Sequence, residues 1–142
     1  QIDAIITDPP YANMMSKAKT GGDKTKKSQI GSTTPFTENQ NDIGNLDYFD
    51  FLESLKIIIE KSLVYLKDKG YLVLFTKDLQ PTKDHHNMLH SDIVEKFSDI
   101  EGLNFKGFKI WYDKSLNLFP YGYPYSYVSN QLHQYILIFR KG

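Results

Sequence analysis

Cysteine is absent from this 142-residue chain, and long apolar runs are missing as well. The first absence excludes disulfide bonds, thiolate metal sites and cysteine nucleophiles, and it fits the reducing cytoplasm in which we expect the protein to lie. The longest apolar runs, 71–76 and 135–139, fall far short of the roughly 18–20 residues that cross a bilayer, so we expect no membrane partner. Hydrophobic residues make up 40% and charged residues 24% of the chain, which is ordinary for a globular domain.

The chain as a whole has no excess of positive or negative charge, but one stretch of it does. The chain has 17 basic and 17 acidic residues and a net charge of zero. Between residues 13 and 35, however, five lysines stand against Asp23 alone, which gives this stretch a charge of +4. This charge is compatible with a solvated loop and with a polyanionic partner. The lysines are Lys17, Lys19, Lys24, Lys26 and Lys27.

The first half of the chain predicts a strand, a long loop and a helix. Residues 2–7 are mostly apolar and β-branched and stop at two prolines, which predicts a buried parallel strand. Residues 12–46 are polar, contain several glycines and show no periodicity, so we expect a long loop that is the most mobile part of the free chain. Apolar residues then recur every three or four positions over 47–69, with Asp47 as N-cap, and predict a helix.

The second half predicts three more strands and a short helix. Residues 71–76, 105–113 and 135–140 have strand patterns, and the apolar spacing from Ile93 predicts a helix that ends near Gly102. Strands that alternate with helices predict a parallel α/β sheet. Because no helix separates the last two strands, we expect the final strand to run antiparallel to its neighbours.

The sharpest chemical feature is Asp8-Pro9-Pro10-Tyr11, directly after the first predicted strand. Ligands of open α/β sheets bind outside the carboxyl ends of the strands. The two prolines stiffen the turn and lack N–H groups, so the turn offers acceptors, and Asp8 adds a carboxylate. Acceptors beside the flat ring of Tyr11 suit a planar ligand with an exocyclic amino group, although such a turn can also be purely structural.

The motif Ile5-Ile6-Thr7-Asp8-Pro9-Pro10-Tyr11 resembles the catalytic motif of the amino-group DNA methyltransferases, which methylate N6 of adenine or N4 of cytosine. The segments around 47–76 and 123–139 resemble the family's following helix and strand and its last motif and strand. The resemblance implies a site-specific, adenine-directed enzyme of the restriction–modification type, with Asp8, Pro9, Pro10 and Tyr11 as catalytic residues. It implies the C-terminal half of a Rossmann-like methyltransferase sheet, with residues 1–142 as a partial methyltransferase domain.

The cofactor implied by the resemblance is S-adenosyl-L-methionine. The family's glycine-rich cofactor turn is not found among the nine glycines of this chain, so most of the cofactor site is expected outside it. The chain also begins with Gln1 rather than Met, and we expect it to be a fragment that is inactive alone.

DNA is the partner that the resemblance implies, and the target base has to be flipped out of the duplex. Tyr11 would stack on the base, with Tyr123 and Tyr125 as further stacking candidates from an aromatic stretch over 119–127. That stretch can equally pack on the edge of the sheet. The five lysines would contact the phosphate backbone.

Two alternatives to a DNA methyltransferase stay open. The same acceptor turn suits an RNA methyltransferase that acts on a guanine amino group, and a nucleic-acid-binding module without catalysis can retain the turn. No metal site is expected: His85, His86 and His90 lack a clustered third ligand type and are expected to be exposed to solvent. Trp111 is expected in the core or at the edge of the sheet.

Overall fold

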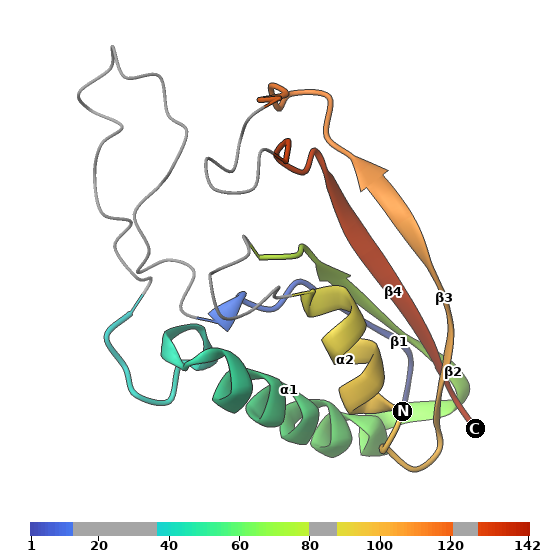
Figure 1. Cartoon of the computed structure of the whole chain (residues 1–142). Helices are drawn as coiled ribbons and strands as arrows, with labels where there is room; N and C mark the ends of the chain where they lie inside the picture. Colours follow the sequence, from blue (N-terminus) through green and yellow to red (C-terminus); the bar gives the residue numbers. More distant parts are fainter. Residues whose placement is uncertain (13–36, 80–87, 121–127) are drawn as a thin grey trace.

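A computed structural model describes residues 1–12, 37–79, 88–120 and 128–142 (Figure 1). The four predicted strands and two predicted helices are all present in the predicted order. The elements are β1 (Ile2–Thr7), the 3-10 turn η3 (Ile43–Asn45), α1 (Tyr48–Ser62), the 3-10 turn η4 (Leu63–Tyr65), β2 (Leu66–Thr76), α2 (Leu89–Phe97), β3 (Leu103–Tyr112) and β4 (His133–Lys141).

The strands form one mixed sheet in the order β1-β2-β4-β3. β1 and β2 are parallel, with Thr7 opposite Leu74. β4 is antiparallel to both β2 and β3, which confirms the prediction for the last strand. The carboxyl ends of β1, β2 and β3 and the start of β4 therefore meet at one edge of the sheet, which we call the carboxyl edge.

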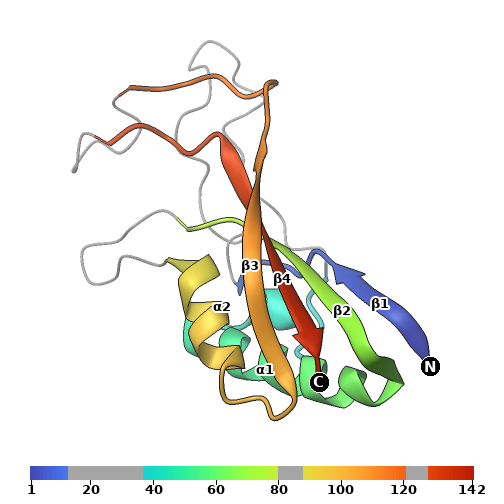
Figure 2. The same ribbon diagram turned by 90° about the vertical axis from the view of Figure 1, so that its right-hand side faces the viewer.

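Both helices lie on the same face of the sheet (Figures 1 and 2). Each buries one apolar stripe, as the three- and four-residue spacing predicts. The stripes pack on alternate residues of the two central strands, where Leu72 lies opposite Phe139 and Leu74 opposite Leu137. Each fully buried side chain of this kind stabilises the fold by about 1.5–3 kcal/mol. The helix stripes consist of Phe51, Leu52, Leu55 and Ile59 in α1 and Leu89, Ile93 and Phe97 in α2.

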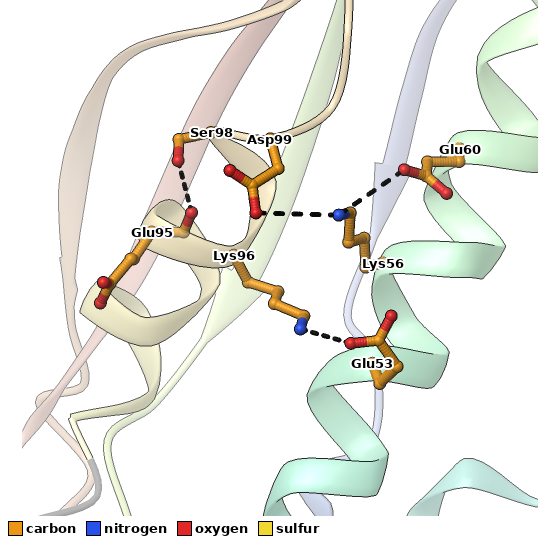
Figure 3. A network of polar contacts seen from close by, with 7 residues as sticks. All are labelled: Glu53, Lys56, Glu60, Glu95, Lys96, Ser98 and Asp99. Carbon is orange, nitrogen blue, oxygen red and sulfur yellow. Dashed lines mark hydrogen bonds and ion pairs between the residues drawn. The ribbon is translucent and has the colours of Figure 1, made fainter.

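Polar contacts join the outer surfaces of the two helices (Figure 3). Lys96 of α2 forms an ion pair with Glu53 of α1. Lys56 of α1 lies 3.9 Å from Asp99, beyond the end of α2, and also 3.9 Å from Glu60 on its own helix. Because the carboxylates of these pairs are 44–73% exposed, the pairs orient the helices more than they stabilise the fold.

The helix predicted over 47–69 is shorter than expected at its C-terminal end. Asp47 is the N-cap and accepts a hydrogen bond from the N–H of Asp50 at 2.9 Å, as predicted. The helix ends at Ser62, however, and β2 already begins at Leu66. The apolar spacing continues into β2 because Leu66 is fully buried there. Lys69 then takes a left-handed conformation at φ 64°, which produces the irregular pairing between β1 and the start of β2.

β1 is less buried than its apolar sequence predicts. Ile6 is 67% exposed, whereas Ile5 packs against the core. The physical reason is that β1 is an edge strand with helices on one face only, so alternate side chains face outward. α2 both starts and ends earlier than predicted: it spans Leu89–Phe97, whereas the sequence predicted an end near Gly102. No helix in the described ranges is long and apolar enough to cross a membrane.

Candidate active site

The Asp8-Pro9-Pro10-Tyr11 turn lies at the carboxyl edge, immediately after β1. The last residue of β1, Thr7, still pairs with β2, so the chain leaves the sheet at Asp8. The Asp8 side chain is exposed, while Pro9 is buried and anchors the turn. A carboxylate is thereby held on a stiff turn at the edge where ligands of α/β sheets bind.

Tyr11 contacts both Asp8 and the hydrophobic core. Its hydroxyl donates a hydrogen bond of 2.8 Å to Oδ1 of Asp8. Its ring packs against the hydrophobic core, so it is only partly available for stacking on a base. Burial, and then the bond to Asp8, raise the pKa of the Tyr11 hydroxyl, which stays protonated as a donor. The ring and the hydroxyl together fix the direction of the Asp8 carboxylate.

A second segment, η3, packs against the Asp8-Pro9-Pro10-Tyr11 turn. A Cβ added to Gly44 would lie 3.1 Å from Cβ of Pro10, a tight contact that would require η3 or the turn to shift by a few tenths of an ångström. Asp42 caps η3 by accepting a hydrogen bond from the Gly44 N–H at 2.9 Å. Ala12, which follows the turn, is 1% exposed and has a φ of 50°. The sequence analysis missed η3, although Asp42 two residues before a glycine is a recognisable turn signal.

A histidine–carboxylate pair lies at the same carboxyl edge, after β2. Nδ1 of His90 is 2.7 Å from Oδ1 of Asp78, and the backbone N–H of His90 donates to the same oxygen at 3.1 Å. The His90 ring stacks on Tyr135 with ring centroids 3.8 Å apart. The expectation that His90 is solvent-exposed is therefore wrong, because a carboxylate and a ring enclose it. Asp78 has 7% of its side chain exposed.

The other predicted site residues fall outside the described ranges. These are the five lysines Lys17, Lys19, Lys24, Lys26 and Lys27, the stacking candidates Tyr123 and Tyr125, and His85 and His86. The expected mobility of the loop over 12–46 also stays a prediction, because residues 13–36 of it lie outside the described ranges. Among the described residues no group of histidines and carboxylates could hold a metal ion. Trp111 lies on the edge strand β3 and is 52% exposed, in line with the edge position expected for it.

A cavity of about 750 Å³ lies away from the predicted residues, between α1 and α2. Its walls carry Glu53, Asp92, Glu95 and Asp99 with Lys96 as their cation. The ion pairs of Figure 3 cross this region. Its acidic walls disfavour a nucleic-acid phosphate, so this cavity does not extend the candidate site.

Among solved structures, this chain is similar to TTHA0409 from Thermus thermophilus, which is described as a candidate DNA modification methylase. Its complex with S-adenosyl-L-methionine superposes on 99% of this chain with a TM-score of 0.59 and 21% identity. A second crystal structure of TTHA0409 gives the same score and identity. A selenomethionine derivative matches 67% of this chain with a TM-score of 0.51 and 25% identity. No protein-family model and no curated protein matches the sequence.

The superposition covers only part of each TTHA0409 chain. This chain spans 38–47% of the length of the TTHA0409 chains. More than half of that protein therefore has no counterpart here. What the comparison establishes is an α/β fold with a four-stranded mixed sheet that resembles part of a DNA methylase structure.

Proposed function

We propose that this chain carries the catalytic turn of an S-adenosyl-L-methionine-dependent methyltransferase that acts on an exocyclic amino group of DNA, with adenine N6 as the target. The observation that carries the proposal is the Asp8-Pro9-Pro10-Tyr11 turn at the carboxyl edge, with the Tyr11 hydroxyl bonded to Asp8. The resemblance of the fold to TTHA0409 supports it.

The chemistry follows from the acceptors of the turn. The amino nitrogen of adenine is a weak nucleophile because its lone pair is delocalised into the ring. In our proposal the amino protons are donated to the Asp8 carboxylate and the Pro9 carbonyl, which localises the lone pair. As the N–C bond forms, the S–C bond of the sulfonium would break and the neutral thioether would leave. The nitrogen gains positive charge, which the Asp8 carboxylate stabilises until one amino proton is released to solvent; a preorganised group of this kind contributes about 2.7–4 kcal/mol.

Tyr11 has a double role in this account. Its hydroxyl occupies Oδ1 of Asp8 and fixes the carboxylate, so Oδ2 is the oxygen that we assign to the amino group. The exposed part of its ring then contributes to stacking on the flipped base, an interaction worth about 1–3 kcal/mol per base. Tyr123 and Tyr125 remain proposed partners of the base, and the five lysines between residues 13 and 35 remain proposed phosphate contacts.

S-adenosyl-L-methionine supplies an electrophilic methyl group on a sulfonium. The described residues offer acceptors for an amino group but no glycine-rich turn at the start of a helix, which is the usual backbone cradle for such a cofactor. We therefore assign to this chain the acceptor side of the site. Most cofactor contacts are assigned to residues outside these 142.

The proposal is tested by the identity of the methylated product. A polypeptide that contains this chain is incubated with methyl-labelled S-adenosyl-L-methionine and either duplex DNA or RNA, and the nucleosides are then separated. Label in N6-methyladenine from DNA supports the proposal. Label in a guanine of RNA, or nucleic-acid binding without any label, favours one of the two alternatives and contradicts it.

A further inference from the structure

β3, β4 and the described segments between them, 113–120 and 128–132, form an arm that carries an exposed apolar patch. In both views the arm extends from the carboxyl edge beyond the end of β2, as its orange and red traces show (Figures 1 and 2). A single exposed apolar side chain is ordinary, but a group of them marks an interaction site. Four large apolar side chains at the end of the arm are 41–57% exposed. We call them the arm patch: Leu116, Leu118, Phe119 and Val128.

Asn130 fixes the backbone beneath the arm patch. Its side-chain oxygen accepts a hydrogen bond from the N–H of Phe119 at 2.6 Å, and its side-chain nitrogen donates one to the carbonyl of Asn117 at 3.0 Å. Its own backbone N–H donates to the carbonyl of Phe119 at 3.4 Å. One residue thus joins the segment before the gap to the segment after it. The backbone is held while the apolar side chains stay exposed, which is the arrangement of a preorganised contact surface.

The arm is basic, whereas the helical part of the chain is acidic. Residues 103–120 and 128–142 contain five basic residues and one acidic residue, a net charge of +4. Residues 37–79 and 88–102, which include both helices, contain six basic and twelve acidic residues, a net charge of −6. A polyanion is therefore attracted to the arm and repelled by the helical layer.

The acidic groups near the end of the arm do not cancel this charge. Asp113 is the one acidic residue of the arm, and it accepts a hydrogen bond from the Ser115 hydroxyl at 2.6 Å. Lys77, at the end of β2, adds a cation beside it, and Lys114 follows it in the chain. Asp8 lies at the same carboxyl edge, but its carboxylate is assigned to the amino group of the target base and not to a phosphate.

We propose that the arm binds duplex DNA, with Lys109 and Lys114 on phosphates and Leu118 inserted as an apolar wedge into the space that the flipped base leaves. The inference rests on the proposed function, because base flipping creates that space. Proteins that deform DNA insert leucine and phenylalanine between base steps in this way. Leu118 is assigned as the wedge because it is the most exposed member of the arm patch, at 57%. This role is distinct from stacking on the target base itself.

A duplex with one abasic site tests the wedge without knowledge of a recognition sequence. Such DNA offers a gap for which no base has to be unpaired. We expect a polypeptide that contains this chain to bind a fluorescein-labelled abasic duplex at least about tenfold more tightly than the intact duplex, as measured by fluorescence anisotropy. Leu118→Ala should reduce this preference to about threefold or less. Val64→Ala is the control, because Val64 is 66% exposed in η4, at the opposite end of the sheet, and the preference should persist.

The salt dependence of binding tests the phosphate contacts. Each contact contributes about 0.9 to the slope of the logarithm of the binding constant against the logarithm of the salt concentration. Lys114→Ala should therefore lower the magnitude of the slope by about 0.9 for the intact duplex. Lys61→Ala, which removes an exposed lysine of α1, should leave the slope unchanged.

Several results would overturn the proposal. They are equal affinity of the unaltered protein for the two duplexes, an undiminished preference in Leu118→Ala, or equal slopes for Lys114→Ala and Lys61→Ala. Tighter binding to single-stranded RNA of the same length than to either duplex would assign the arm to an RNA substrate instead. None of these readouts involves methyl transfer. Label in N6-methyladenine without an abasic preference would contradict this inference alone, whereas the preference without any label would contradict the proposed function alone.

Discussion

At the scale of single residues, the candidate site depends on how closely η3 approaches the turn after β1. Gly44 lies so close to Pro10 that an added Cβ would make a tight contact with it. The contact is remote in sequence, so no motif reveals it. Pro10 cannot yield easily, because it is fixed between Pro9 and Tyr11.

We predict that Gly44→Ala displaces the turn and lowers the rate of methyl transfer. The new Cβ would lie 3.1 Å from Cβ of Pro10 and 3.2 Å from Oδ1 of Asp42, so one of them has to move. Overpacking of this kind costs about 1–3 kcal/mol, which thermal unfolding measures. Gly102→Ala is the control: it adds backbone strain at φ 75° but meets no neighbour within 4 Å. A transfer rate reduced equally by both changes would contradict the positioning role of Gly44.

His90 gives a second prediction at the residue scale. Its removal in His90→Ala leaves the buried Asp78 carboxylate without its side-chain partner and should cost about 1–3 kcal/mol in the free energy of unfolding. His133→Ala is the control, because His133 meets the same Tyr135 ring edge-on with centroids 5.1 Å apart. Denaturant unfolding should show a clearly smaller loss for the control. Equal losses would mean that ring contact, and not the bond to Asp78, stabilises this part of the edge.

At the scale of the elements, Tyr48 joins the start of α1 to α2 because its hydroxyl donates a hydrogen bond to Asp92. Burial, and then this bond, raise the pKa of the Tyr48 hydroxyl. Burial and the bond to Asp8 raise the pKa of Tyr11 in the same direction. The folded chain therefore keeps these protons at pH values where the unfolded chain has lost them.

We predict that stability falls in strongly alkaline solution. An unfolded tyrosine titrates near about pH 10, so the stabilisation is complete below that pH and is lost as the pH rises through the raised pKa. Tyr48→Phe removes one such group and should make the decline shallower, as followed by denaturant unfolding between about pH 9 and 11. A decline that is equally steep in the variant would contradict the assigned role of the Tyr48 bond.

The elements also show what sequence periodicity can predict. All four strands and both helices follow from apolar spacing and turn residues. The end of α1 at Ser62 could not be predicted in this way, because the buried Leu66 fits both the helical spacing and the strand β2 that begins there. The low burial of β1 could not be predicted either, since composition cannot distinguish a strand covered on two faces from an edge strand covered on one.

At the scale of the whole molecule, the sequence predicted the turn of the candidate site but not its supports. Asp8 and Tyr11 lie together in a local motif and were found from it. Gly44 and the pair of Asp78 with His90 are brought to the same edge only by the fold. Long-range contacts of this kind leave no local signal in one sequence.

We predict that the 142-residue chain by itself binds S-adenosyl-L-methionine weakly or not at all. It contains the acceptor turn but no glycine-rich turn, and it spans 47% of the TTHA0409 chain in the complex with that ligand. Isothermal titration calorimetry is the measurement. A dissociation constant of about 1 μM or lower, near −8 kcal/mol, would show that the cofactor site lies within these residues.

The central claim is that Asp8 stabilises the methylated amino group, and Asp8→Ala tests it most directly. The measurement is kcat for methyl transfer to adenine-containing duplex DNA by a polypeptide that contains this chain, with the melting temperature as a check on folding. Asp3→Ala is the matched control, because Asp3 is an exposed aspartate near the opposite end of β1, paired with Lys67 at 2.8 Å. We expect Asp8→Ala to lower kcat by about 10²–10³-fold, or about 2.7–4 kcal/mol, and Asp3→Ala to leave it unchanged. An Asp8→Ala protein that folds and keeps more than about a tenth of the wild-type kcat, a loss below about 1.4 kcal/mol, would contradict the account.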